Sequence, residues 1–207
     1  MSQNFIITGT DTDIGKTVFA AMLVQALQAN YWKPLQSGID GGVDTKTVQD
    51  LTGLPDAHFL PEKHIFSEPL SPHRAAEIDG VTVDVDALEV PDSERALIIE
   101  GAGGLMVPLS RENLQVNLFK KWQIPVILCA RTGLGTLNHT LLSLEALWSR
   151  QIKIHGIAFI GEENDDNIRT IANFSKEKVL GRLPQLETLN ADSLKTAFEK
   201  NFKLGDF

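Results

Sequence analysis

The segment at residues 9–17, Gly-Thr-Asp-Thr-Asp-Ile-Gly-Lys-Thr, constrains the fold of this chain more than any other. It follows the short apolar run at 5–7, expected to form a strand, and precedes residues 18–27, which are rich in good helix formers. A glycine-containing loop between a strand and a helix that opens with Gly-Lys-Thr is typical of a phosphate-binding loop. One departure is that Thr10 stands where the usual pattern has glycine, and Gly9 lies one residue earlier.

The chemistry of such a loop depends on its backbone and on two side chains. Backbone N–H groups in the loop and the first helical turn can hold a phosphate without a counter-charge. Lys16 would add a positive charge near the terminal phosphates, and the Thr17 hydroxyl can bind Mg2+. The alternative is an ordinary strand-to-helix turn, in which Gly-Lys-Thr has no simple purpose. The residues expected to contact a nucleotide here are Asp13, Ile14, Gly15, Lys16, Thr17 and Val18.

Composition favours a single domain over residues 1–207, because a chain of 207 residues with 43% hydrophobic content can bury one full core. The net charge of −8 argues against a nucleic-acid-binding surface. No apolar run is long enough to span a bilayer and no signal-peptide pattern is seen, so a cytoplasmic protein without membrane association is expected. Cys129, the single cysteine, lies in an apolar run and is expected to be a buried thiol rather than a nucleophile.

The order of the predicted elements indicates an α/β fold. Strands are expected at 96–99, 125–130, 154–160 and 179–180, and helices at 113–122, 138–150 and 165–174. An extended segment at 31–35, a helix at 45–51 capped by Asp44, an irregular region at 54–74 and a last helix from Asp192 to about 202 complete the chain. This alternation predicts a doubly wound, mostly parallel sheet with helices on both faces, in which ligands bind beyond the carboxyl ends of the strands.

Glu100 ends the predicted strand at 96–99 and is followed by Gly-Ala-Gly-Gly at 101–104. An acidic residue at such a strand end, near a phosphate-binding loop, is a natural Mg2+ ligand, and the glycines would let the backbone approach a phosphate or a substrate. The alternative is a solvated glutamate at the start of a turn. Asp44 could share the metal while it caps its helix.

Lys33 stands at the end of the second extended segment, before Pro34, in a nearly apolar stretch. Its position predicts a side chain that stabilises charge in a transition state, although a solvated surface lysine stays equally open from spacing alone. Ser37, before a glycine, would donate a hydrogen bond to substrate or phosphate, or simply form a turn.

The histidines predict no metal centre. His73 follows Ser-Pro and is more often structural than catalytic at such a place. The five histidines show no metal-ligand spacing with one another, and with one cysteine in the chain a zinc site is not expected. A Gly-x-Ser-x-Gly nucleophile elbow is missing from the sequence.

Taken in order, the motifs resemble the dethiobiotin synthetase family over nearly the whole chain. They are Gly-Thr-Asp-Thr with Gly-Lys-Thr at 9–17, Lys-Pro and Ser-Gly at 33–38, Ser-Pro-His at 71–73, Glu-Gly-Ala-Gly-Gly at 100–104 and Pro-Val-Ile-Leu at 125–128. The resemblance accounts for the displaced Gly9, since the family's loop has this form. It implies a P-loop NTPase-like fold and a homodimer with a shared substrate site.

The resemblance also implies the reaction. The family is an ATP-dependent ligase of biotin synthesis that joins CO2 and 7,8-diaminononanoate into the cyclic urea of dethiobiotin. One amine forms a carbamate, whose oxygen attacks the γ-phosphate to give a carbamic–phosphoric anhydride. The second amine then closes the ring and releases phosphate. Positioning and charge neutralisation should dominate such a phosphoryl transfer.

Matching positions give the expected role of each residue. Lys16 and Lys33 would be catalytic, and Thr17, Asp44 and Glu100 would hold Mg2+. Further contacts to the nucleotide are expected from Gly101, Ala102, Gly103, Leu183 and Pro184, and contacts to the substrate from Thr12, Ser37 and Asn138. Asn138 belongs to a glycine-rich loop and helix start at 133–139, where the helix N-terminus of one subunit would bind the substrate carboxylate in the other's site.

One departure from the family concerns the base of the nucleotide. The family commonly has an asparagine that contacts adenine just after the strand at 154–160, but this chain has Ile160, Gly161 and Glu162 there. The nearest candidate, Asn164, would require a shifted loop. Weak selectivity among bases is therefore expected.

Two other classes stay open from the residues alone. A partner-regulated switch ATPase would typically carry a second lysine early in the loop, where this chain has Asp11. A small-molecule kinase would release a stable phosphorylated product without needing CO2. The residues alone lead to Mg-nucleotide phosphoryl transfer and do not choose the acceptor.

Overall fold

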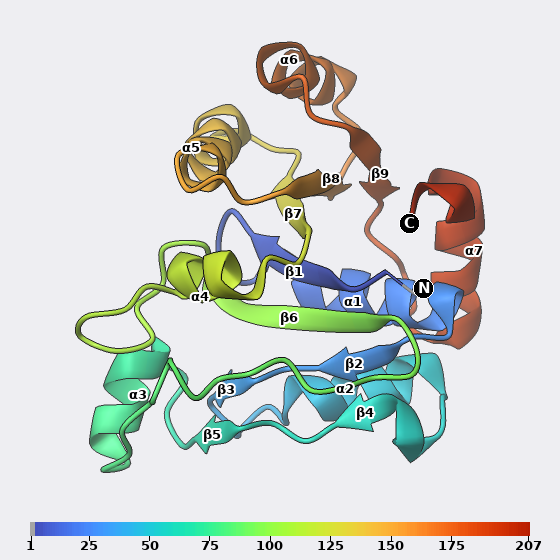
Figure 1. Cartoon of the computed structure of the whole chain (residues 1–207). Helices are drawn as coiled ribbons and strands as arrows, with labels where there is room; N and C mark the ends of the chain where they lie inside the picture. The colour runs from blue at the N-terminus through green and yellow to red at the C-terminus, as the bar shows by residue number, and fades with distance from the viewer. Residues whose placement is uncertain (1–2) are drawn as a thin grey trace.

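The computed structural model describes residues 3–207 and is built on a seven-stranded sheet in which every pairing is parallel (Figure 1). In spatial order its strands are β4 (Phe59–Leu60), β2 (Asn30–Trp32), β6 (Leu97–Gly104), β1 (Phe5–Gly9), β7 (Val126–Arg131), β8 (Ile154–Ile160) and β9 (Val179–Leu183). A second, two-stranded parallel sheet joins β3 (Leu35–Ser37) to β5 (His64–Phe66).

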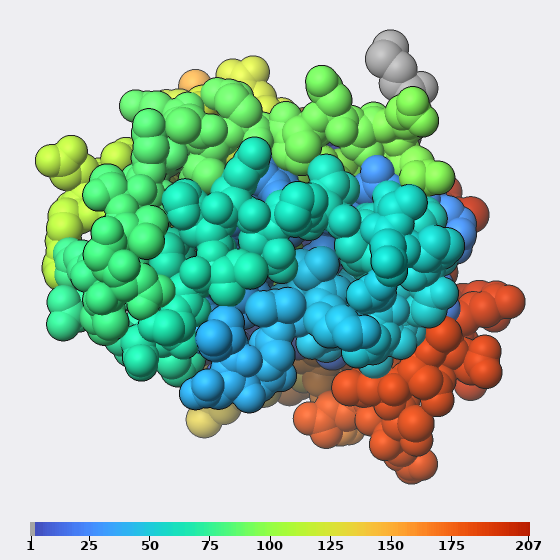
Figure 2. Space-filling model, turned by 90° about the horizontal axis from the view of Figure 1, so that it is seen from below, coloured from blue at the N-terminus to red at the C-terminus, as the bar shows by residue number. Residues whose placement is uncertain are grey.

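Helices cover both faces of the large sheet, so the predicted doubly wound architecture is confirmed. One face packs against α1 (Lys16–Leu27), α2 (Asp44–Thr52) and α7 (Ala191–Asn201). The other packs against α4 (Gln115–Trp122), α5 (Thr136–Trp148) and α6 (Asp165–Ser175). A smaller core lies under α3 (Pro72–Ile78) and the β3–β5 pair. Seen from below, the surface is formed mainly by the segments coloured cyan to green, with α7 in red at one edge (Figure 2).

The sequence explains why this sheet is central. β1 is buried along its whole length, as expected of a parallel strand covered by helices on both faces. β6 and β7 flank it in parallel, so the loops after all three strands lie at one edge of the sheet. Among residues 3–207, none of the helices combines the length and the apolarity that crossing a membrane requires.

The expectation of an irregular region at 54–74 was wrong. It contains a 3₁₀ turn at Asp56–His58, the strands β4 and β5, and the start of α3. These strands have two and three residues and exist because they pair with β2 and β3. Such pairing depends on distant residues, so the local pattern could not reveal it.

Two predicted helix caps were also wrong. Val43 is the N-cap of α2, and Asp44 is the first helical residue without a capping bond. Asn190, not Asp192, caps α7 in a reciprocal arrangement, in which its side chain accepts from the backbone N–H of Ser193 at 2.9 Å. The helix expected from residue 138 begins at Thr136, because Gly135 adopts the left-handed conformation at its N-cap.

Candidate active site

The phosphate-binding loop joins β1 to α1 and is held in shape by glycine and lysine. Gly15, the N-cap of α1, has φ of 94°, a conformation that side-chain-bearing residues rarely adopt. A Cβ at Gly9 would lie only 2.5 Å from Ile14 Cδ1, so a glycine at position 9 leaves room for the Ile14 side chain. Lys16 Nζ donates to the carbonyl of Asp11 at 2.8 Å and so lies over the loop. Burial lowers the pKa of Lys16, although the charge of Glu100 opposes this.

Glu100 is the centre of the charged cluster. Its carboxylate is 1% exposed, which excludes the solvated glutamate that the sequence left open. Oε1 accepts from Thr17 Oγ1 at 2.9 Å and from Lys33 Nζ at 2.9 Å, and Oε2 accepts from the Tyr31 hydroxyl at 2.8 Å. The strand β6 does not end at this glutamate but continues through the following glycines.

The register of the sheet brings these side chains together. Trp32 pairs with Ile99, so Lys33, the next residue, stands opposite Glu100. Tyr31, two residues before Lys33, points to the same face of the sheet. Tyr31 could not be found from the sequence, because only the register between two strands distant in the sequence places its hydroxyl at Glu100.

Lys33 is 5% exposed and bonds to both Asp44 and Glu100, so it is not a surface lysine. Burial alone would lower its pKa, but the two neighbouring carboxylates raise the pKa above its usual value. The side chain therefore keeps its positive charge at neutral pH.

Two cavities meet at this cluster. The first, of about 280 Å³, is lined by Thr12, Asp13, Gly15, Lys16, Thr17, Val18, Lys33, Asp44, Glu100 and Gly103. The second, of about 390 Å³, extends from the same cluster toward β3 and the segment at 69–72. They share Thr12, Asp13, Lys33, Asp44 and Gly103. A group bound in one cavity can therefore meet a group bound in the other beside Lys33.

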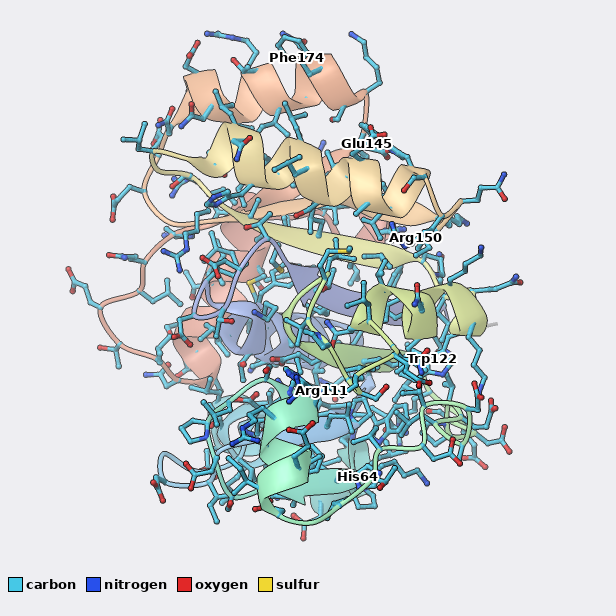
Figure 3. The ribbon with its side chains drawn as sticks, turned by 90° about the vertical axis from the view of Figure 1, so that its left-hand side faces the viewer. His64, Arg111, Trp122, Glu145, Arg150 and Phe174 are labelled. Atoms are coloured by element: carbon cyan, nitrogen blue, oxygen red, sulfur yellow. The ribbon has the colours of Figure 1, made fainter. Side chains whose placement is uncertain are left out.

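The second cavity has both polar and apolar walls. Ser37 lines it, and its buried Oγ has no hydrogen-bond partner among residues 3–207, so it is open to a ligand. Leu35, Leu70 and Val107 are apolar lining residues. The wall at 69–72 leads into α3, which Arg111 holds through a bond to Glu77 at 2.7 Å (Figure 3).

The donor set at the cluster suits a hard divalent cation. The hydroxyl of Thr17 and the carboxylates of Asp44 and Glu100 converge on one place, and oxygen ligands are those that Mg2+ prefers. Lys33 is paired with both carboxylates and offsets one of their two negative charges. The described residues contain no group of three or more His, Cys, Asp and Glu side chains that could hold a metal, so Mg2+ would also need water or phosphate ligands.

The Gly-Ala-Gly-Gly segment has mixed roles. Gly103, with φ of 60°, lines both cavities. The backbone N–H of Ala102 donates to Gln115 Oε1 at 2.6 Å and is already engaged, although Ala102 lines the second cavity. A Cβ at Gly101 would lie 2.9 Å from the Phe119 ring, so Gly101 allows close packing against α4 and lines neither of the two cavities.

The residues expected at the base and at the substrate carboxylate lie outside this cluster. The Leu183 side chain is buried in the core, and Pro184 lines a separate cavity beside α7. Asn138 is exposed in the first turn of α5. Asn164 caps α6 by accepting from the backbone N–H of Asn167 at 3.1 Å, so its loop is fixed rather than shifted toward a nucleotide.

Cys129 is fully buried in β7, as expected. Burial raises the pKa of its thiol, so the thiolate form that a nucleophile needs is disfavoured.

Comparison with known proteins assigns the family. A family model described as an AAA domain matches residues 3–193. A protein of Rhodopseudomonas palustris (strain HaA2) named ATP-dependent dethiobiotin synthetase BioD is 53% identical over 207 residues, covering 100% of this chain and 97% of the relative. The chain belongs to the dethiobiotin synthetase family. A dethiobiotin synthetase of Bradyrhizobium diazoefficiens is 51% identical over 208 residues, with 100% and 99% covered. The resemblance found in the motifs is thus confirmed.

Solved structures show that the dethiobiotin synthetase fold is shared more widely. The septum site-determining protein MinD of Pyrococcus horikoshii, in complex with Mg-ADP, aligns with a TM-score of 0.56 at 12% identity, covering 97% of this chain and 96% of that one. A ParA family ATPase of Chlorobium tepidum aligns with a TM-score of 0.52 at 14% identity, covering 98% and 91%. These likenesses concern the fold alone.

Proposed function

We propose that this chain is an ATP-dependent dethiobiotin synthetase, which closes the ureido ring from 7,8-diaminononanoate and CO2 and releases ADP and phosphate. The observation that carries the proposal is the meeting of two cavities at Lys33, one beside the phosphate-binding loop and one with apolar walls and an unpaired hydroxyl. The identity of 53% with a named dethiobiotin synthetase supports the choice of reaction.

The nucleotide belongs in the cavity beside the loop. Lys16 would leave the Asp11 carbonyl and bind the terminal phosphates, while the N-terminus of α1 favours their negative charge. Lys33 remains positively charged and stands at the boundary of the two cavities, where charge develops as the phosphoryl group moves.

The diamine belongs in the second cavity. Its aliphatic chain would lie against Leu35, Leu70 and Val107, and its carbamate near Ser37 and Thr12. The amine adds to CO2 and loses a proton, and the carbamate oxygen then bonds to the γ-phosphorus as the bond to ADP breaks. The second amine attacks the carbamate carbon, and the C–O bond to phosphate breaks as the ring closes.

The metal belongs with the triphosphate. Thr17, Asp44 and Glu100 are the residues that would hold Mg2+. When bound, Mg2+ neutralises charge on the phosphate oxygens. The chain's own contribution is to orient the two carboxylates, through Lys33 and the hydroxyls of Thr17 and Tyr31.

The protein is expected to act as a cytoplasmic homodimer, with Asn138 near the carboxylate of a substrate bound mainly by the other subunit. Leu134, just before α5, is fully exposed, and Leu142 on α5 is 61% exposed, so this face offers apolar surface to a second copy. Light scattering should give a dimer at assay concentration, and Leu134→Asp should lower both dimer content and turnover. An active monomer would refute the shared site.

One assay tests the reaction itself. ADP release should require ATP, 7,8-diaminononanoate and bicarbonate, and should fall to background when any of the three is omitted. Dethiobiotin should appear in a one-to-one ratio with ADP. A phosphorylated diamine formed without CO2 would instead indicate a small-molecule kinase, and turnover that needs a protein partner would indicate a switch ATPase.

A further inference from the structure

Tyr31 is the single tyrosine of the chain and is fully buried in β2. Its hydroxyl donates to Glu100 Oε2 at 2.8 Å. None of the described residues other than Tyr31 donates a hydrogen bond to this oxygen, whereas Oε1 of the same carboxylate accepts from Thr17 and Lys33. The two oxygens of Glu100 therefore have separate partners.

We propose that Tyr31 is a positioning residue of the phosphoryl-transfer site, which fixes the Glu100 carboxylate so that Oε1 faces Thr17 and Lys33. The proposal rests on the proposed function, because it gives Glu100 a place beside the transferring phosphate. Tyr31 itself touches neither cavity, so it acts through Glu100 alone.

The burial of the pair makes this bond important. Glu100 is 1% exposed, so water does not replace a missing donor at Oε2. A buried carboxylate oxygen without a donor is costly, and rotation of the group is the available way to reduce that cost. Rotation would carry Oε1 away from its two partners.

Contacts on both faces of β2 hold the Tyr31 side chain in place. Trp32, on the opposite face of the strand, donates from Nε1 to the Pro61 carbonyl at 3.1 Å, and its ring centroid lies 5.7 Å from that of Trp122. Tyr31 packs in the core beneath α1. The strand is thus held from both faces, and Tyr31 and Lys33 reach the same carboxylate from one backbone.

The first arm of the test is kinetic and compares Tyr31→Phe with a matched control. Thr52→Val is suitable, because it also removes one buried hydroxyl, which bonds to the Val48 carbonyl at 2.8 Å within α2, away from the cavities. Tyr31→Phe should raise the Mg2+ concentration for half-maximal activity about tenfold, which equals about 1.4 kcal/mol. The KM for the diamine should stay within about twofold, since the second cavity is unchanged. Thr52→Val should change neither value.

The second arm needs no turnover. Tyrosine labelled with ¹³C at the ring carbon bearing the hydroxyl gives one resonance, because the chain has one tyrosine. In the wild type this resonance should shift when Mg2+ and ADP are added together and stay in place with ADP alone. In Glu100→Gln it should start from a different position and no longer respond to Mg2+.

The two arms separate the possible failures. A resonance that is identical in the wild type and Glu100→Gln, or an unchanged Mg2+ requirement in folded Tyr31→Phe, overturns the positioning role. If Tyr31→Phe does not fold, the labelled Glu100→Gln comparison decides alone. If the wild type forms no dethiobiotin while its resonance depends on Glu100 and Mg2+, the proposed reaction falls and the positioning role stands.

Discussion

The two ends of the expected nucleotide site are built differently. At the phosphate end, Lys16 and Thr17 of α1 converge with Lys33 and Glu100 from distant parts of the chain. Lys16, Lys33 and Glu100 are buried, and Thr17 is partly buried. At the base end, after β8 and β9, the chain offers Gly161, the backbone of Leu183 and amides that already have structural partners. If the nucleotide binds as proposed, charged side chains hold the phosphoryl group, and backbone and shape are left to contact the base.

The difference has an energetic basis. A buried charge that loses its partner is left without compensation, whereas a lost contact in a partly exposed region is replaced by water. Substitutions at the phosphate end should therefore have large effects, and changes at the base, whether in the protein or in the nucleotide, should have small ones.

The largest effect is expected for Lys16→Ala. Loss of the lysine should lower kcat about a thousandfold, because it removes the positive charge that lies over the loop and lines the cavity beside it. Dethiobiotin formation under saturating ATP gives the measurement. Lys120→Ala, an exposed lysine of α4, is the control and should keep full activity with the same circular dichroism spectrum. Near-normal turnover in Lys16→Ala would mean that catalysis at the phosphate end does not depend on this buried charge.

Lys33→Met should have the next largest effect, about a hundredfold in kcat. The change leaves Asp44 and Glu100 facing each other without a cation, so the free energy of unfolding should fall by about 3 kcal/mol. Urea titrations measure this loss, and it should shrink when Mg2+ is added, because a divalent cation can take the place of the ammonium group. A loss that is unaffected by Mg2+ would mean that the two carboxylates do not form a metal site.

Glu100→Gln sharpens the comparison within the phosphate end. The amide keeps the shape but loses the charge, so the Mg2+ concentration for half-maximal activity should rise about tenfold while the KM for the diamine changes little. Glu199→Gln, an exposed residue of α7, is the matched control and should leave the Mg2+ titration where it is in the wild type. If both titrations coincide with that of the wild type, Glu100 is not a ligand.

The sequence predicted the fold well because its long elements carry their own signal. The buried run of β1, the loop after it and the apolar strand at 154–160 are visible in local patterns, and parallel order follows from their alternation with helices. β4 and β5 are too short for such a signal and depend on their partner strands. At α7 the cap was mistaken because two polar residues stand near the helix start, and Asn190 forms the bond that Asp192 was expected to form. At α2 the helix begins one residue earlier than expected, so Asp44 lies inside it and the apolar Val43 is the N-cap.

The candidate site was predictable where the residue type limits its use. A glycine–lysine–threonine loop and a glutamate after an apolar strand have few structural purposes, so the sequence predicts roles for Lys16 and Glu100, and the structure brings both to one cavity. Tyr31 could not be identified, because a tyrosine in a strand is usually a core residue and only its register with Ile98 directs it to Glu100. Gly101 was expected at the nucleotide, but the structure uses it for packing against Phe119.

The smallest effect is expected for a change of base. Position 161 cannot easily carry the family's asparagine, because Gly161 has φ of 130° and a Cβ there would lie 2.7 Å from Thr132 Oγ1. Asn167 donates its amide to the Thr132 carbonyl at 2.8 Å, and Arg182 donates to the Gly161 carbonyl at 2.9 Å, so nearby polar groups are engaged.

A bidentate amide contact to a base is worth about 1–3 kcal/mol, and without it the bases should be nearly equivalent. The phosphate end holds the triphosphate whatever the base, so GTP and CTP should support turnover within about tenfold of ATP, a difference of about 1.4 kcal/mol. The measurement is kcat/KM for the three nucleotides at saturating diamine and CO2. A preference for ATP above about a hundredfold would mean that backbone groups at 181–189, or Asn164 after release from its cap, bind adenine. The base end would then select its ligand as strictly as the phosphate end does. The two ends would differ only in using backbone or amide groups for the base and charged side chains for the phosphates.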